Sequence, residues 1–121
     1  MRIESSIVFF PCRNLAETTD FYVAKLGLAL WRERKDYIIL DSGKGYIGFC
    51  NYGKNHPMAS GACISLNLSS CEAVDEEYHN LKERKLRGLR QAPSRHSVFP
   101  VYSFFLEDPN GYTVEFQTIL D

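Results

Sequence analysis

The sequence repeats one order of predicted elements, and this repeat limits the possible folds more than any other feature. Each half is predicted to form a strand, a helix and then three further strands, from its apolar alternation and its helical spacing. In the first half the predicted elements are 3–12, 15–26, 28–34, 37–41 and 46–52. In the second half they are 62–68, 71–87, a short strand near 88–91, 101–107 and 112–118. We therefore interpret the chain as an internal duplication of a unit of roughly 55 residues.

Two pairs of glycines support the repeat. Gly27 and Gly88 each end a predicted helix, where a glycine in the left-handed conformation is common. Gly45 and Gly111 each lie in a predicted turn, and each is followed by a tyrosine. Aligning the two halves on these glycines places Phe49 at the position that Glu115 holds in the second half.

The repeat predicts an α+β fold in which two β-α-β-β-β units form a curved mixed sheet around a cavity, with the helices outside. One helix per half cannot cover both faces of its sheet, so the uncovered faces are expected to enclose the cavity. The chain, 1–121, is then one domain: unit 1 is about 1–52, a polar linker is 53–60, and unit 2 is about 61–121. The alternative interpretation is an α+β sandwich whose symmetry is coincidental.

Charge and composition exclude several classes of partner. Lys and Arg total 14 and Asp and Glu total 15, a net charge of −1, whereas nucleic-acid binders carry a basic excess. No apolar run approaches the ~20 residues that span a bilayer, so we expect no membrane partner and a cytoplasmic location. The four cysteines contain no Cys-x-x-Cys pair, which disfavours a zinc site and favours free thiols in a reducing compartment.

Two motifs resemble those of a known superfamily. Phe21-Tyr22 followed by Leu26-Gly27-Leu28, and Asp108-Pro109-Asn110-Gly111 followed by Glu115, resemble the vicinal oxygen chelate superfamily. This superfamily includes glyoxalase I, extradiol dioxygenases and bleomycin-resistance proteins. The resemblance covers essentially the whole chain and implies the duplicated fold, but one fold carries many chemistries.

The resemblance also implies four positions for metal ligands, two in each unit. Carried over to this sequence, they fall on Ile7, Phe49, Cys63 and Glu115, with an uncertainty of about one residue at Cys63. Only Glu115 is a customary ligand, and the side chains of Ile7 and Phe49 have no atom that can donate to a metal. Catalytic metal centres usually have three protein ligands. We therefore expect no metal and no other cofactor, as in the bleomycin-resistance-like branch.

Alternation along the strands assigns side chains to the predicted cavity face. The residues expected to bind a ligand there are Ile7, Phe9, Phe49, Asn51, Cys63, Ser65, Asn67, Thr113, Glu115 and Gln117. The residues expected to face the helices instead are Val8, Phe10, Ile64, Leu66, Val114 and Phe116. The alternative is ordinary packing around trapped water.

The roles of two candidate residues have alternatives that the sequence leaves open. His96 lies in a loop that borders the cavity in the resembled family, and it either contacts a ligand or is solvated. Glu115 either contacts a ligand, pairs with a structural partner such as an arginine, or, least favoured, holds a metal. No catalytic residue is assigned.

The leading hypothesis is a protein that binds a small organic ligand without metal, in a cleft of a homodimer, and sequesters an antibiotic or a similar molecule. The first alternative is a metal-dependent enzyme of the same superfamily, a lyase or a dioxygenase-like protein. The second is a structural or regulatory module whose cavity is filled by side chains.

Overall fold

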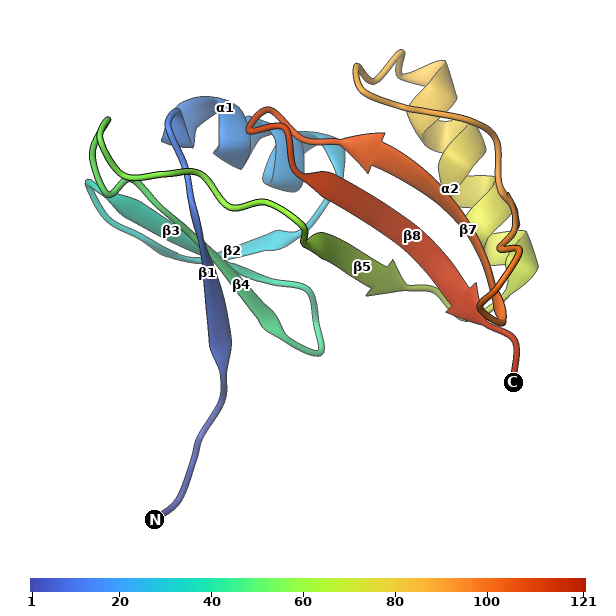
Figure 1. Cartoon of the computed structure of the whole chain (residues 1–121), viewed down its shortest axis with the longest axis horizontal. Coiled ribbons are helices and arrows are strands. Elements are labelled where there is room, and N and C mark those ends of the chain that lie inside the picture. The colour runs from blue at the N-terminus through green and yellow to red at the C-terminus, as the bar shows by residue number, and fades with distance from the viewer. The chain divides into compact units, whose positions relative to one another are not determined.

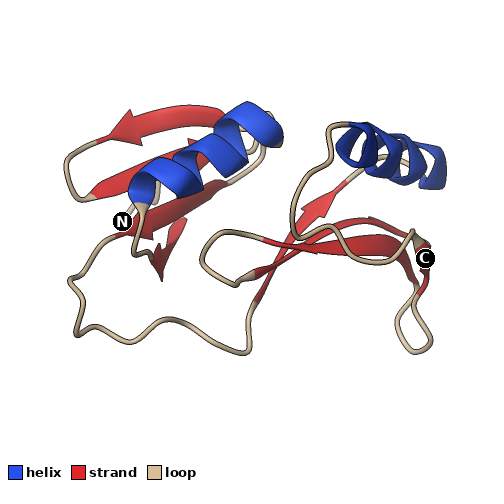
Figure 2. Ribbon diagram, turned by 90° about the horizontal axis from the view of Figure 1, so that it is seen from above, coloured by secondary structure: helices blue, strands red, loops and turns tan.

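The computed structural model describes residues 1–121, which form two compact units, Met1–Ser60 and Gly61–Asp121. Each unit contains a four-stranded mixed sheet with helical residues against one of its faces (Figures 1 and 2). The predicted α+β fold of two β-α-β-β-β units is confirmed, and neither sheet by itself closes into a barrel.

Unit 1 contains six elements in chain order. They are β1 (Ile7–Pro11), α1 (Leu15–Thr19), η1 (Asp20–Lys25), β2 (Ala29–Glu33), β3 (Tyr37–Asp41) and β4 (Tyr46–Cys50). The strands lie in the order β1-β4-β3-β2, with β1 parallel to β4 and the other pairs antiparallel. The first strand begins at Ile7 rather than at the predicted residue 3, because residues 1–6 have no partner strand.

The helix of unit 1 begins at its predicted cap and then widens. The Asn14 side chain accepts a hydrogen bond of 3.0 Å from the Glu17 amide. From Asp20 onward the helix continues as η1, a π-helical turn in which the Leu26 amide bonds to the Phe21 carbonyl, five residues earlier. This wider turn keeps both Phe21 and Tyr22 buried against the sheet.

Unit 2 contains five elements in chain order. They are β5 (Cys63–Asn67), α2 (Cys71–Glu83), β6 (Ser94–Arg95), β7 (Val101–Glu107) and β8 (Thr113–Ile119). The strands lie in the order β5-β8-β7-β6, with β5 parallel to β8. The strand predicted near 88–91 is wrong: only a single bridge joins Leu89 to Leu106, and the fourth strand is the short β6.

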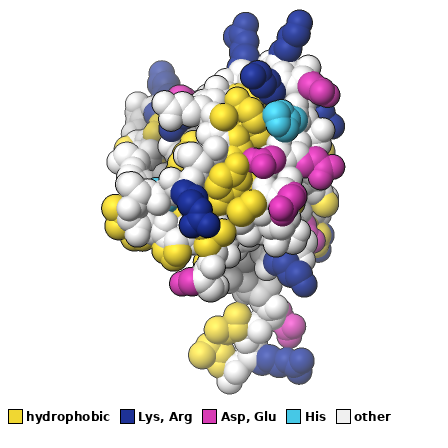
Figure 3. All heavy atoms as spheres, turned by 90° about the vertical axis from the view of Figure 1, so that its right-hand side faces the viewer, with side chains coloured by type: hydrophobic (Ala, Val, Ile, Leu, Met, Phe, Trp, Pro, Cys, Tyr) yellow, Lys and Arg dark blue, Asp and Glu magenta, His cyan; other side chains and the backbone are white.

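Helix α2 follows the predicted charge pattern but is shorter than predicted. The Ser70 side chain caps it by accepting from the Ala73 amide at 3.1 Å. It ends at Glu83 rather than near residue 87, since Lys85 already has a left-handed φ of 55°. On the side of the molecule seen in Figure 3, acidic side chains gather beside a hydrophobic strip, with basic side chains at the upper end. With 13 residues, α2 is the longest helix, and the structure contains no helix that could span a bilayer.

Aromatic rings form the core of each unit on the face that its helix covers. In unit 1 the Phe49 ring is fully buried, and its centroid lies 4.9 Å from that of the Tyr22 ring in η1. In unit 2 the centroid of the Phe104 ring lies 5.4 Å from the ring centroids of both Tyr78 in α2 and Phe116 in β8. Burial of such rings dominates core energetics. The opposite face of each sheet, here called the helix-free face, is therefore where a site can form.

Candidate functional site

The helix-free face of unit 2 carries a row of polar side chains from two adjacent parallel strands. Cys63, Ser65 and Asn67 of β5 lie beside Thr113, Glu115 and Gln117 of β8 in register. The Gln117 amide donates a hydrogen bond to the Asn67 side-chain oxygen at 2.9 Å. The six residues predicted to share one face in this unit therefore do share it.

Glu115 is the acidic centre of this face. Its residue is only 8% exposed, and its Oε1 accepts a hydrogen bond of 2.5 Å from the Ser65 hydroxyl. A buried carboxylate prefers several donors or a cation, because burial removes the water that would solvate it. No ion pair with Glu115 is found in the structure. It can therefore accept further hydrogen bonds from a bound molecule.

Cys63 lies next to this pair. Its sulfur is 3.7 Å from the Ser65 hydroxyl oxygen. Partial burial of the sulfur raises the pKa of the Cys63 thiol, and the negative charge of Glu115 raises it further, against opposing effects of Ser65 and Arg90. The thiol is therefore protonated at neutral pH and acts as a weak hydrogen-bonding group rather than as a thiolate.

A pocket of about 660 Å³ opens beside this row. It is lined by residues of the segment 90–94 and by Ser103, Phe104 and Phe105 of β7. Ser103 lies directly opposite Gln117 and Phe105 lies directly opposite Glu115, so both belong to the helix-free face. The sequence did not indicate this pocket, because the residues on either side of Ser103 in β7 are apolar on both faces and alternation alone does not single it out.

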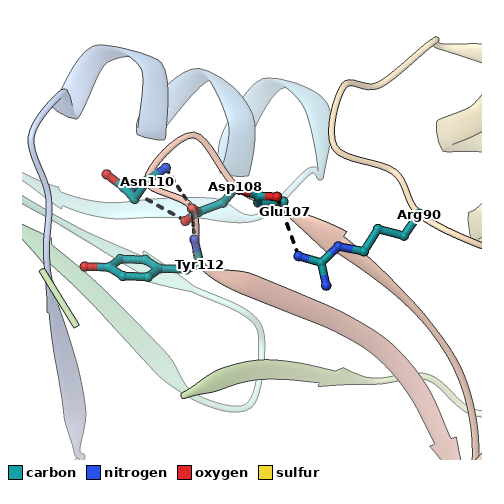
Figure 4. A network of polar contacts seen from close by, with 5 residues as sticks. All are labelled: Arg90, Glu107, Asp108, Asn110 and Tyr112. Carbon is teal, nitrogen blue, oxygen red and sulfur yellow. Dashed lines mark hydrogen bonds and ion pairs between the residues drawn. The ribbon is translucent and has the colours of Figure 1, made fainter. Parts of the chain in front are cut away.

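The Asp-Pro-Asn-Gly motif has a structural role at the end of this sheet. Asp108 is buried, and its Oδ1 accepts hydrogen bonds from the amides of Asn110 and Tyr112 at 2.8 and 2.9 Å (Figure 4). Gly111 has a φ of +87°, which side chains rarely adopt. The motif thus fixes the turn from which β8, and with it Glu115, begins.

The helix-free face of unit 1 differs from the predicted one. Ile7 and Phe9 do lie on it, since the Phe9 ring covers Gly48 and lies 6.3 Å from the Tyr37 ring. Phe49 does not: its ring contacts Tyr22 and lies 5.9 Å from the Phe10 ring, on the helix-covered face. The prediction that Phe49 lines a cavity beside Ile7 is therefore wrong, and Gly48 holds that place.

The error comes from the lengths of two turns. Asp41 pairs with Tyr46 across a turn of residues 42–45, whereas Glu107 pairs with Thr113 across residues 108–112. The second turn is one residue longer, so aligning Gly45 with Gly111 shifts the strands by one. A shift of one residue moves every side chain to the other face.

Two other predicted site residues make local contacts. Asn51 lies just beyond β4, where its side-chain oxygen accepts from the Gly53 amide at 2.9 Å. The His96 Nδ1 accepts from the amides of Val98 and Phe99 at 3.0 Å each, and its ring packs 4.9 Å from the Phe99 ring. Both side chains thus shape their own loops, and neither lines the pocket of unit 2.

The residues present do not fit the metal centre that the resemblance implies. Neither unit gathers three or more His, Cys, Asp or Glu side chains that could hold a metal ion. At the implied positions in unit 1 the side chains are Ile7 and Phe49, and the neighbour on the helix-free face is Gly48, so none can donate to a metal.

Comparisons with known proteins agree with this fold. The family model described as the Glyoxalase/Bleomycin resistance protein/Dioxygenase superfamily matches residues 6–116. Similar solved structures include a glyoxalase/bleomycin resistance protein/dioxygenase from Alicyclobacillus acidocaldarius, with 26% identity, a TM-score of 0.78, and coverage of 100% of this chain and 96% of that chain. A family enzyme from Burkholderia phytofirmans has 20% identity and a TM-score of 0.78, with 95% and 98% covered. No curated protein matches significantly.

Proposed function

Because the chain belongs to the Glyoxalase/Bleomycin resistance protein/Dioxygenase superfamily, we propose that it is a small-molecule-binding protein that needs no metal or other cofactor. The proposed site is the helix-free face of unit 2. The observation that carries this proposal is the buried Glu115 carboxylate, which has one hydrogen-bond donor and no ion pair. A bound molecule with donor groups supplies what this carboxylate lacks.

The chemistry of the face indicates the kind of ligand. Glu115 accepts hydrogen bonds, while the Asn67–Gln117 pair presents amide donors and acceptors. Phe105, opposite Glu115, supplies an apolar surface. Ligand sites commonly combine such an apolar wall with a few placed polar groups. The ligand class is therefore an organic molecule with an apolar part and an amine, amide or hydroxyl donor, which includes many antibiotics.

A binding screen tests the proposal. The full chain is screened by thermal shift against amine-bearing, acidic and neutral small molecules, and each hit is repeated with Glu115→Gln. We expect amine-bearing hits whose affinity falls about tenfold in this variant, since hydrogen bonds to charged groups contribute about 1.5–3 kcal/mol.

Glu76→Gln serves as the matched control, because it makes the same charge change on an exposed residue of α2. Hits that weaken equally in both variants, or a screen without amine-bearing hits, would contradict the proposal.

A metal-dependent enzyme is the second candidate. Glu115 favours it, because it is the only customary metal ligand among the four implied positions. A similar solved structure is also described as a family enzyme. Elemental analysis of the dialysed protein separates the two candidates. The binding proposal predicts no stoichiometric nickel, zinc, manganese or iron. About one such ion per chain, with activity on methylglyoxal–glutathione adducts restored by metal, would support the enzyme.

We also propose that the chain forms a homodimer in the cytoplasm. The edge strand β2 of the unit 1 sheet pairs with β3 on one side only, and all of its residues are exposed. All four cysteines are free, which suits a reducing compartment. Light scattering at micromolar concentration is expected to give twice the chain mass, and a monomer mass at high concentration would contradict the dimer.

A further inference from the structure

The pocket of unit 2 results from a local break in strand pairing. The Arg90 amide bonds to the Phe105 carbonyl at 3.1 Å, and Ser94 pairs with Ser103. Between these two points, the three residues 91–93 face the single residue Phe104. The segment must therefore bow away from β7, and the resulting pocket of about 660 Å³ lies within the usual range for small-molecule sites.

The floor of this pocket contains a polar group that is free to bind. Ser103 is only 4% exposed, and its hydroxyl forms no hydrogen bond within the chain. No fully buried side-chain oxygen in the structure lacks a partner, so the Ser103 oxygen is reachable from the pocket that it lines. The pocket therefore presents an unpaired hydroxyl, which can donate one hydrogen bond. A ligand atom that accepts a hydrogen bond would satisfy it.

The rim of the pocket carries a weakly held cation. The Arg90 guanidinium points toward Glu107 of β7, with 3.6 Å between nitrogen and oxygen (Figure 4). Both side chains are about half exposed, and such surface ion pairs contribute little to stability. The guanidinium has several N–H donors, so a ligand carboxylate can bind it in the fork geometry that arginine favours.

Phe105 and Arg90 lie in line with Glu115, and Ser103 lies two residues farther along β7. Three adjacent backbone segments carry Glu115, Phe105 and Arg90. Phe105 pairs with Glu115 on one side, and its carbonyl accepts from the Arg90 amide on the other. Neighbouring strands lie about 4.8 Å apart, so the line spans about 10 Å. One molecule can therefore place a donor at Glu115, an apolar middle over Phe105 and an acid at Arg90.

We infer that the pocket between β7 and residues 90–94 binds the carboxylate of a ligand through Arg90 and Ser103, while the ligand's donor group reaches Glu115. The inference rests on the proposed binding function and names its ligand class: an aromatic or aliphatic molecule with an acid at one end and an amine or other donor at the other. Glu107 competes with that acid for Arg90, and so limits the affinity of the pocket.

Four probes of similar size test the inference with the full chain: 4-(aminomethyl)benzoate, benzoate, benzylamine and benzamide. NMR-detected titration gives the affinity of each. We expect the first to bind most tightly and benzoate to bind more tightly than benzamide. Arg90→Gln should weaken benzoate about tenfold and leave benzylamine unchanged, because only the acid contacts the guanidinium.

Glu107→Gln is the matched variant, because it removes the competitor and leaves Arg90 in place. It should increase the affinity for benzoate about threefold, and structural damage would not increase this affinity. Ser103→Ala should weaken benzoate and not benzylamine. Benzoate binding that is unchanged in Arg90→Gln, or no tighter than benzamide in the wild type, would overturn the inference.

The two proposals fail in different ways. If benzylamine binding depends on Glu115 while benzoate binding ignores Arg90, the carboxylate pocket is wrong and the proposed function stands. If benzylamine binding also ignores Glu115, the proposed site on unit 2 is wrong as well.

Discussion

The two units share one topology but present opposite chemistry on their helix-free faces. In unit 1 this face is aromatic: Phe9 covers Gly48 and approaches Tyr37, and Trp31 stacks 4.4 Å from Tyr46. In unit 2 the equivalent strands carry the hydrogen-bonded pairs Ser65–Glu115 and Asn67–Gln117. The same backbone thus supports an apolar surface in one unit and a polar site in the other.

This difference shows where each unit can vary. The helix-covered faces are both packed with rings, since each must bury apolar area to fold. The helix-free faces do not have to bury as much apolar area, and so their residues can be suited to binding a ligand. Substitutions on the helix-covered faces should therefore lower stability, whereas substitutions on the helix-free faces should affect it less.

The largest effect is expected for Phe49→Ala. Phe49 is fully buried against Tyr22, and removing a buried phenyl ring costs about 3–5 kcal/mol of unfolding free energy. Phe9→Ala is the matched control on the helix-free face, where Phe9 is 41% exposed, and it should cost clearly less. Urea denaturation measures both. Equal losses would mean that the two faces are not distinguished by packing.

A smaller loss is expected for Gly48→Ala. A Cβ built at Gly48 would lie 2.5 Å from the Phe9 ring, so the ring must shift. Such overpacking costs about 1–3 kcal/mol. The double variant Gly48→Ala/Phe9→Ala removes the clash and should recover part of the loss. A double variant whose losses simply add, measured in the same denaturation series, would contradict the contact.

The smallest effect concerns Tyr102, which joins β7 to α2. Its hydroxyl donates to Asp75 at 2.5 Å, and this hydrogen bond, with lesser effects of burial and of the charge of Asp75, raises the pKa of Tyr102 to about 12. Tyr102→Phe should cost about 1 kcal/mol at neutral pH.

The pH dependence of this effect has a defined sign. Folding holds the Tyr102 proton more tightly than the unfolded chain does, whose tyrosine pKa is 10.0. The stabilisation is complete below pH 10 and is lost as the pH rises toward 12. The difference in unfolding free energy between wild type and Tyr102→Phe should therefore shrink above pH 10. A difference that grows over this range would contradict the assignment.

The sequence predicted the fold, and it predicted which side chains share the helix-free face of unit 2. Alternation correctly placed Ser65 and Glu115 together, because β5 and β8 are regular and their partners follow in register. It failed at Phe49, where a difference of one residue between two turns is invisible to glycine matching. The pocket was also missed, since it depends on how far residues 91–93 bow away from β7, and strand periodicity does not specify that distance.

The central claim is that a ligand binds the helix-free face of unit 2 through Glu115. Titration of the ¹⁵N-labelled chain with benzylamine tests it most directly. The account predicts saturable shifts that are largest at the amides of Ser65, Phe105 and Glu115 and that are lost in Glu115→Gln. Saturable shifts centred on unit 1 or on α2, or shifts that persist in Glu115→Gln, would contradict it.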